Sequence, residues 1–151
     1  YKPNMIKGKY RLDMINLAIK KYPNLSSSDF ELQDKMIYTY ETLNYFQKKY
    51  PNDTIYFICG TDNINYLDSW KKPEEIKKIP ILVIKRKKEK IKPEILKKEN
   101  ITYINMRCTS ISSTKIREKI FQKKNIQKYV PKEVETYIYQ KKLYRKEKNY
   151  V

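Results

Sequence analysis

The stretch Thr54-Ile55-Tyr56-Phe57-Ile58-Cys59-Gly60 decides the fold class of this chain of 151 residues. Its β-branched and aromatic residues predict a strand. The unbroken apolar run predicts that both faces of this strand are buried, as in a parallel sheet. Gly60 ends the run, and a helical pattern follows over 63–70. A strand followed at once by a helix is the unit from which parallel α/β folds are built.

The same alternation of strand and helix continues on both sides of this stretch. Further strands are predicted over 29–32, 81–84 and 101–106, and helices over 11–21, 38–49, 73–78, 114–124 and from Pro131 onward. The basic run 85–92 is interpreted as a solvated loop. We therefore expect one α/β domain of the Rossmann type, in which a parallel sheet carries helices on both faces.

Composition narrows the range of partners. Lysine and arginine number 34 against 17 aspartates and glutamates, which gives a net charge of +17. This charge favours polyanionic ligands, but the lysines are spread along the whole chain, so nucleic acid is the less favoured partner. No run approaches the length of a membrane span and no signal peptide is visible. Cys59 and Cys108 lie far apart and histidine is absent, which argues against a zinc site and suits the cytoplasm.

Several residues occur where parallel sheets bind ligands, outside the carboxyl ends of the strands. Gly60 lets a ligand approach the backbone closely, and Asp62 can accept hydrogen bonds from ribose hydroxyls. A structural glycine followed by a helix cap is the alternative. Arg86 ends the next predicted strand. Trp70, the only tryptophan, either stacks on a heteroaromatic ring or packs in the core.

A hydroxyl cluster begins the helix predicted from residue 114, in the segment Ile111-Ser112-Ser113-Thr114-Lys115-Ile116-Arg117. A helix N-terminus carries N–H groups without helical partners and about half a positive charge. Hydroxyls there can cap the helix and also donate to phosphate oxygens. Arg117 lies one turn further, on the face of Ser113 and Thr114. The segment therefore suggests a nucleotide polyphosphate site, and an ordinary cap beside a surface arginine is the alternative.

Several segments together resemble one family and cover nearly all of the chain. They are Arg11-x-x-Met14, Tyr38-Thr39-(x)2-Thr42-Leu43, Gly60-x-Asp62-(x)4-Leu67-(x)2-Trp70, Ser112-Ser113-Thr114-x-Ile116-Arg117, and Val130-Pro131-(x)2-Val134-(x)2-Tyr137-Ile138 followed by Leu143-Tyr144. In this order and spacing they resemble the bacterial nicotinate-nucleotide adenylyltransferases. The hydroxyl segment is shared with pantetheine-phosphate adenylyltransferase, whereas the segments around Thr39 and Trp70 favour the pyridine-nucleotide branch.

The resemblance implies a reaction in which the adenylyl group of ATP passes to nicotinate mononucleotide, giving deamido-NAD and pyrophosphate. Catalysis would then rest on positioning and charge neutralisation, with Mg²⁺ accompanying ATP. Trp70 is implied to stack on the pyridine ring, Thr39 to hold its carboxylate together with nearby backbone N–H groups, and Asp62 to contact the ribose.

The resemblance further implies that Ser112, Ser113, Thr114 and the catalytic Arg117 grip the ATP phosphates, and that Arg86 lies near the nucleotide. Family members begin with a strand and then Gly-x-Phe-Asp-Pro-x-His-x-Gly-His, whose histidines bind the triphosphate. The present 151 residues contain no histidine. We therefore expect an N-terminally truncated enzyme that lacks this first strand–helix unit and is inactive by itself.

The alternative is a basic α/β module that binds nucleotide or RNA without chemistry. The preference between nicotinate and nicotinamide mononucleotide, homo-oligomer formation and the identity of the metal stay open.

Overall fold

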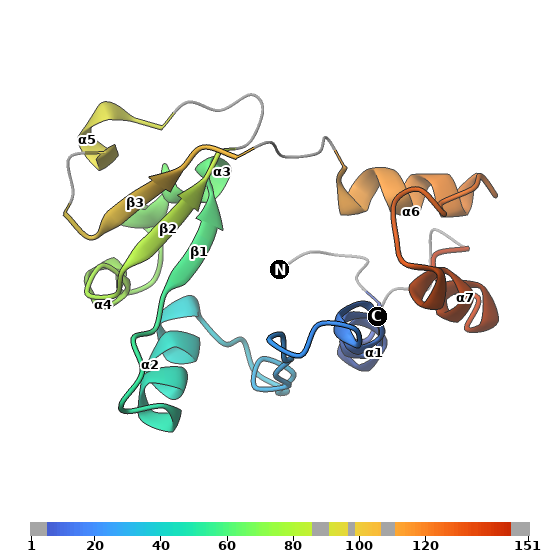
Figure 1. Cartoon of the computed structure of the whole chain (residues 1–151), viewed down its shortest axis with the longest axis horizontal. Coiled ribbons are helices and arrows are strands. Elements are labelled where there is room, and N and C mark those ends of the chain that lie inside the picture. The colour runs from blue at the N-terminus through green and yellow to red at the C-terminus, as the bar shows by residue number, and fades with distance from the viewer. Residues whose placement is uncertain (1–5, 86–90, 97–98, 107–110, 146–151) are drawn as a thin grey trace. The chain divides into compact units, whose positions relative to one another are not determined.

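A computed structural model describes residues 6–85, 91–96, 99–106 and 111–145 (Figure 1). The chain divides into two compact units. The first unit combines Tyr1–Asp34 with Ile111–Val151, and the second comprises Lys35–Ser110. Within the described ranges, no helix is long and apolar enough to cross a membrane.

The second unit contains a parallel sheet. Strands β1 (Phe57–Gly60), β2 (Ile81–Ile84) and β3 (Ile101–Ile104) are hydrogen-bonded in the order β1-β2-β3. The helices of this unit are α2 (Thr39–Lys49), α3 (Thr61–Ile64), the 3-10 helix η1 (Leu67–Ser69), α4 (Pro73–Ile76) and α5 (Pro93–Leu96). Gly60 pairs with Ile84, and Ile84 with Ile104, so the carboxyl ends of the strands meet at one edge. The predicted parallel α/β arrangement is confirmed.

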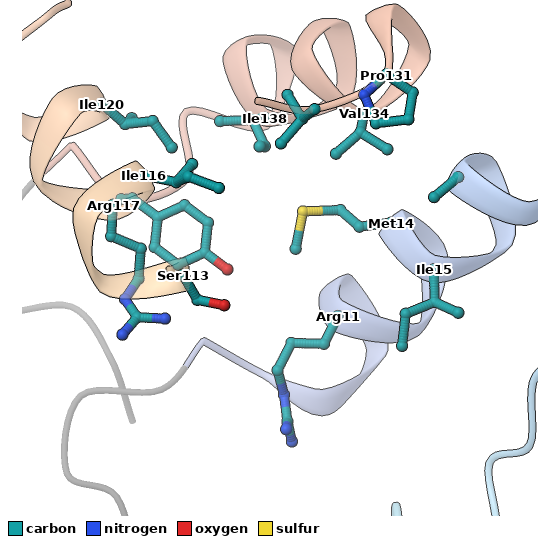
Figure 2. Close-up of a pocket in the computed structure, with 13 residues that line it drawn as sticks. Arg11, Met14, Ile15, Ser113, Ile116, Arg117, Ile120, Pro131, Val134 and Ile138 are labelled. Carbon is teal, nitrogen blue, oxygen red and sulfur yellow. The ribbon is translucent and has the colours of Figure 1, made fainter. Parts of the chain in front are cut away.

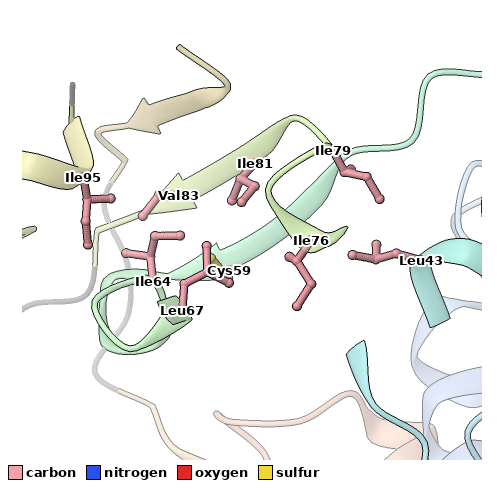
Figure 3. Close-up of a cluster of buried hydrophobic side chains, with 9 residues drawn as sticks. All are labelled: Leu43, Cys59, Ile64, Leu67, Ile76, Ile79, Ile81, Val83 and Ile95. Atoms are coloured by element: carbon pink, nitrogen blue, oxygen red, sulfur yellow. The ribbon is translucent and has the colours of Figure 1, made fainter. Parts of the chain in front are cut away.

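The buried cluster of this unit lies on one face of the sheet (Figure 3). Side chains from strands and helices meet there: Leu43, Cys59, Ile64, Leu67, Ile76, Ile79, Ile81, Val83 and Ile95. Side chains alternate between the two faces of a strand. Ile58, next to buried Cys59, accordingly lies on the opposite face, where its side chain is 59% exposed. Tyr56, two residues earlier, is 53% exposed, so the prediction that the apolar run 54–59 is buried on both faces is wrong for both Tyr56 and Ile58.

The first unit is helical in its described part. Helices α1 (Gly8–Ile19), α6 (Ser113–Phe121) and α7 (Lys132–Gln140) belong to it. Its buried cluster consists of Ile6, Ile120, Ile126, Val134, Ile138 and Leu143. The Tyr137 hydroxyl donates to the Asp13 carboxylate across 2.5 Å, which ties α7 to α1. The Lys21–Glu133 ion pair is exposed and contributes at most about 1 kcal/mol, so apolar packing holds these helices together.

Some local predictions are wrong. Residues 29–32 form turns in place of a strand, because the Ser28 hydroxyl accepts from the Phe30 N–H and the Leu32 N–H donates to the Asp29 carbonyl. Such local bonds compete with a sheet ladder. The helix predicted over 63–70 is replaced by α3 and η1. Helix α5 was not predicted.

Candidate active site

A pocket of about 330 Å³ lies in the second unit, between the start of α2 and the segment that joins η1 to α4. Its lining combines apolar, aromatic and polar side chains: Met36, Ile37, Tyr38, Thr39, Trp70, Lys71 and Ile76. The fold thus brings together Thr39 and Trp70, which the family resemblance implied to contact the same pyridine ring. Lys71 also lines this pocket, and no pattern in the sequence indicated it.

Trp70 is positioned by core packing as well as by the backbone. It follows η1 with extended backbone angles, φ −79° and ψ 164°. Its indole meets the Phe57 ring edge-to-face, with centroids 6.1 Å apart and planes at 70°. Such an aromatic pair contributes about 0.5–1.5 kcal/mol beyond area burial. The half-buried indole therefore packs against the core and also lines the pocket, so the two interpretations of Trp70 are compatible.

The start of α2 supplies the polar end of the pocket. Thr39 is the first residue of this helix, and the Glu41 carboxylate accepts the Tyr38 N–H at 2.9 Å. N–H groups in a first helical turn have no carbonyl partner within the helix, and the macrodipole makes this end positive. An aromatic wall, a hydroxyl and a positive helix end together suit a planar ring that carries a negative group.

A polar network ties α2 to α4 beside this pocket. The Lys72 ammonium lies 3.0 Å from a Glu75 carboxylate oxygen and 4.6 Å from the centroid of the Tyr40 ring. The Asn44 amide donates to the other Glu75 oxygen at 3.0 Å. The hydrogen bond from Asn44, followed by that from Lys72, holds the pKa of Glu75 below its ordinary value. These contacts fix the spacing of the two helices that border the pocket.

The end of β1 carries Gly60 and Asp62. Gly60 has φ −86° and ψ 163°, an extended conformation that does not require glycine. Asp62 lies in the first turn of α3, near Cys59. Burial, and secondly the Asp62 charge, raise the pKa of the Cys59 thiol to about 11, so the thiol is protonated and unreactive at neutral pH. Neither Gly60 nor Asp62 lines the Trp70 pocket, and their contact with a ligand stays a prediction.

Arg86 lies outside the described residues, so its placement near a nucleotide also stays a prediction.

The hydroxyl cluster of the first unit forms the predicted helix start. The Ser112 hydroxyl accepts the Lys115 N–H at 3.2 Å, which makes Ser112 the N-cap of α6. The exposed Arg117 guanidinium donates to the Thr114 hydroxyl at 3.2 Å. Arg117 therefore lies beside this hydroxyl cluster, as predicted. Phosphate binding by these groups stays a prediction.

A second pocket, of about 360 Å³, adjoins this cluster within the first unit (Figure 2). Ser113 and Arg117 from α6 line it together with Arg11 from α1. The remaining lining is mostly apolar: Met14, Ile15, Ala18, Ile116, Ile120, Val130, Pro131, Val134, Ile138 and Tyr144. Among the described residues, Arg11 and Arg117 line this pocket and no acidic side chain does, so this lining carries positive charge. Arg11 was not selected from the sequence as a site residue, although it begins the Arg-x-x-Met segment.

The comparisons with known proteins agree with the α/β fold of the chain. The chain matches the cytidylyltransferase-like family over residues 1–119, and this match defines its class. It is 40% identical over 146 residues to the probable nicotinate-nucleotide adenylyltransferase of Clostridium botulinum (strain Okra / Type B1), covering 89% of this chain and 73% of that protein.

Solved structures of the nicotinic acid mononucleotide adenylyltransferase of Plasmodium falciparum are also similar. The complex with APC has a TM-score of 0.77 at 28% identity, over 91% of this chain and 75% of that one. The complex with NaAD has a TM-score of 0.75 at 28% identity, over 90% and 73%. The chain therefore belongs to the nicotinate-nucleotide adenylyltransferases, within the cytidylyltransferase-like family.

Proposed function

We propose that the protein transfers the adenylyl group of ATP to nicotinate mononucleotide in NAD biosynthesis. The mononucleotide phosphate oxygen attacks the α-phosphorus of ATP, the bond to the β-phosphate oxygen breaks, and pyrophosphate leaves. The products are deamido-NAD and pyrophosphate. The observation that carries this proposal is the family membership over nearly all of the chain, and the pocket that contains Thr39 and Trp70 supports it.

The pyridine end of the substrate belongs, in this proposal, to the pocket of the second unit. Trp70 stacks on the ring, while Thr39 and the N–H groups at the start of α2 bind the carboxylate. Asp62 accepts a hydrogen bond from the ribose, near Gly60. Each of these interactions positions the mononucleotide, and positioning is a large part of catalysis in phosphoryl transfer.

The ATP end belongs to the first unit. Ser112, Ser113 and Thr114 lie at the start of α6, where hydroxyl and N–H donors suit phosphate oxygens. Arg117 supplies a fixed cation one turn further along, and neutralises negative charge on the triphosphate. The described residues contain no group of three or more His, Cys, Asp or Glu side chains that could hold a metal ion. We therefore assign no protein ligands to the Mg²⁺ that ATP brings.

Two assays test the proposal. The first measures deamido-NAD from ATP and nicotinate mononucleotide, using the 151 residues alone and a chimaera that carries the family's Gly-x-Phe-Asp-Pro-x-His-x-Gly-His unit before Tyr1. We expect turnover from the chimaera and very little from the histidine-free chain, because each missing transition-state donor costs about 10²–10³ in rate. A well-folded chimaera that binds both substrates but forms no deamido-NAD would contradict the proposed reaction.

The second assay measures binding through the fluorescence of Trp70, the only tryptophan. We expect nicotinate mononucleotide to quench this fluorescence with a saturable dependence on concentration, in the 151-residue chain itself.

A further inference from the structure

Two lysines follow Trp70, and they have different surroundings. Lys72 is engaged, since it pairs with Glu75 and lies over the Tyr40 ring. Lys71 lines the pocket that contains Thr39 and Trp70. Among the described side chains, no carboxylate lies within ion-pair distance of the Lys71 ammonium. The charge of this lining residue is therefore not neutralised by any carboxylate of the described part of the chain.

The other lining groups strengthen the effect of this charge. Among the described residues, no acidic side chain lines the pocket. The positive end of α2 lies at Thr39, although the Glu41 carboxylate, which accepts the Tyr38 N–H, offsets part of this charge. Beside an ammonium group, a neutral carboxamide on a pyridine ring gains only a charge–dipole interaction, whereas a carboxylate gains the stronger interaction between two opposite charges. The same ring can stack on Trp70 in either form. Charge, and not shape, is thus what distinguishes the two ligands in this pocket.

We propose that Lys71 is a specificity-determining residue that makes the pocket select pyridine carboxylates over pyridine carboxamides, by pairing its ammonium with the carboxylate. The proposal rests on the proposed function, since it places the pyridine ring in this pocket. Lys71 is exposed, so the pair is partly screened by solvent. Exposed pairs contribute about 0.2–1 kcal/mol, which corresponds to a preference of up to about fivefold in Kd.

Fluorescence titrations of Trp70 in the 151-residue chain test this proposal without any turnover. The ligands are nicotinate mononucleotide and nicotinamide mononucleotide, which carry the same phosphate, together with free nicotinate and free nicotinamide, which carry none. The variants are Lys71→Met, which keeps most of the aliphatic stem, and Lys71→Arg, which keeps the charge. Lys48→Met, an exposed lysine in the last turn of α2, is the matched control.

We expect Lys71→Met to weaken both carboxylate ligands by roughly two- to fivefold and to leave both carboxamides unchanged. Lys71→Arg should retain most of the preference, and Lys48→Met should match the unmodified chain. The preference should also fall between about 0.05 and 0.5 M NaCl, because salt screens exposed charges. Melting curves of all variants verify that the second unit is folded.

Several results would overturn the proposal. Equal losses for the two mononucleotides, with no loss for free nicotinate, would assign Lys71 to the phosphate. If Lys71→Met keeps the unchanged preference for carboxylates, Lys71 does not take part in recognising the carboxylate. If none of the four ligands quenches the Trp70 fluorescence saturably, the pyridine ring does not bind in this pocket. Selective binding of carboxylates without adenylyl transfer by the chimaera would contradict the proposed function while leaving the role of Lys71 intact.

Discussion

Replacement of Trp70 by alanine separates the two contributions of this side chain. The indole is half-buried against Phe57 and lines the pocket with its remaining surface. Truncation of a fully buried tryptophan costs about 3–5 kcal/mol, so a half-buried one should cost about 1.5–2.5 kcal/mol of the free energy of unfolding. Loss of stacking should weaken nicotinate mononucleotide by about 1–3 kcal/mol, or about 5- to 150-fold in Kd.

A second variant controls for stability alone. Leu67 is 3% exposed, belongs to the same buried cluster and does not line the pocket. Leu67→Ala should therefore lower the melting temperature at least as much as Trp70→Ala, at a cost of about 2–5 kcal/mol. Below its melting transition, it should bind the mononucleotide with unchanged Kd. Trp70→Phe should recover part of the affinity, since a smaller aromatic face still stacks.

Calorimetric titration suits this comparison, because replacement of Trp70 removes the fluorescent probe. Kd for nicotinate mononucleotide is measured well below each melting temperature, and ATP is titrated in parallel and should change much less. If Trp70→Ala, like Leu67→Ala, lowers the melting temperature but leaves this Kd unchanged, Trp70 has a packing role and the assignment of the pyridine ring to this pocket fails.

Other predictions concern both units. Arg117→Ala should weaken ATP binding by roughly 10- to 150-fold, since a charged hydrogen bond contributes about 1.5–3 kcal/mol. The control variant Lys132→Ala in α7 should bind ATP as the unmodified chain does. If calorimetry gives the same ATP affinity for Arg117→Ala and the unmodified chain, Arg117 does not belong to the phosphate site. Burial, and then the hydrogen bond to Asp13, raise the pKa of Tyr137 to about 12, above about 10 in an unfolded chain. The unfolded state therefore loses this proton first, so the stability of the first unit is complete below about pH 10 and falls toward pH 12. Melting curves of Tyr137→Phe should lack this fall, and an identical pH profile would refute the linkage. In a Cys108→Ser background, Cys59 of the folded chain should react with iodoacetamide at about pH 8 more than about tenfold slower than Cys59 of the chain unfolded in urea. The reason is that the Cys59 pKa is about 11 in the folded chain. Rapid modification of the folded chain would contradict the burial of this thiol.

Elements with local signals could be predicted from the order of residues alone. The apolar run 81–84 coincides with β2, and the helices predicted over 11–21 and 38–49 match α1 and α2 within a few residues. The start of α6 was also predictable, since a serine cap acts within a single turn. Local signals failed where short-range side-chain bonds competed with the expected element, as at Ser28 and Phe30.

Which distant side chains share a pocket depends on tertiary packing. Thr39 and Lys71 become neighbours because the network of Asn44, Lys72 and Glu75 ties α2 to α4, and no periodicity encodes that contact. Arg11 reaches the same pocket as Arg117 because both ends of the chain build the first unit. The exposure of Ile58 could not be predicted either, because an apolar run does not indicate which face of a strand other elements cover. Secondary structure depends on neighbours in sequence, whereas a binding site depends on which segments the core brings together.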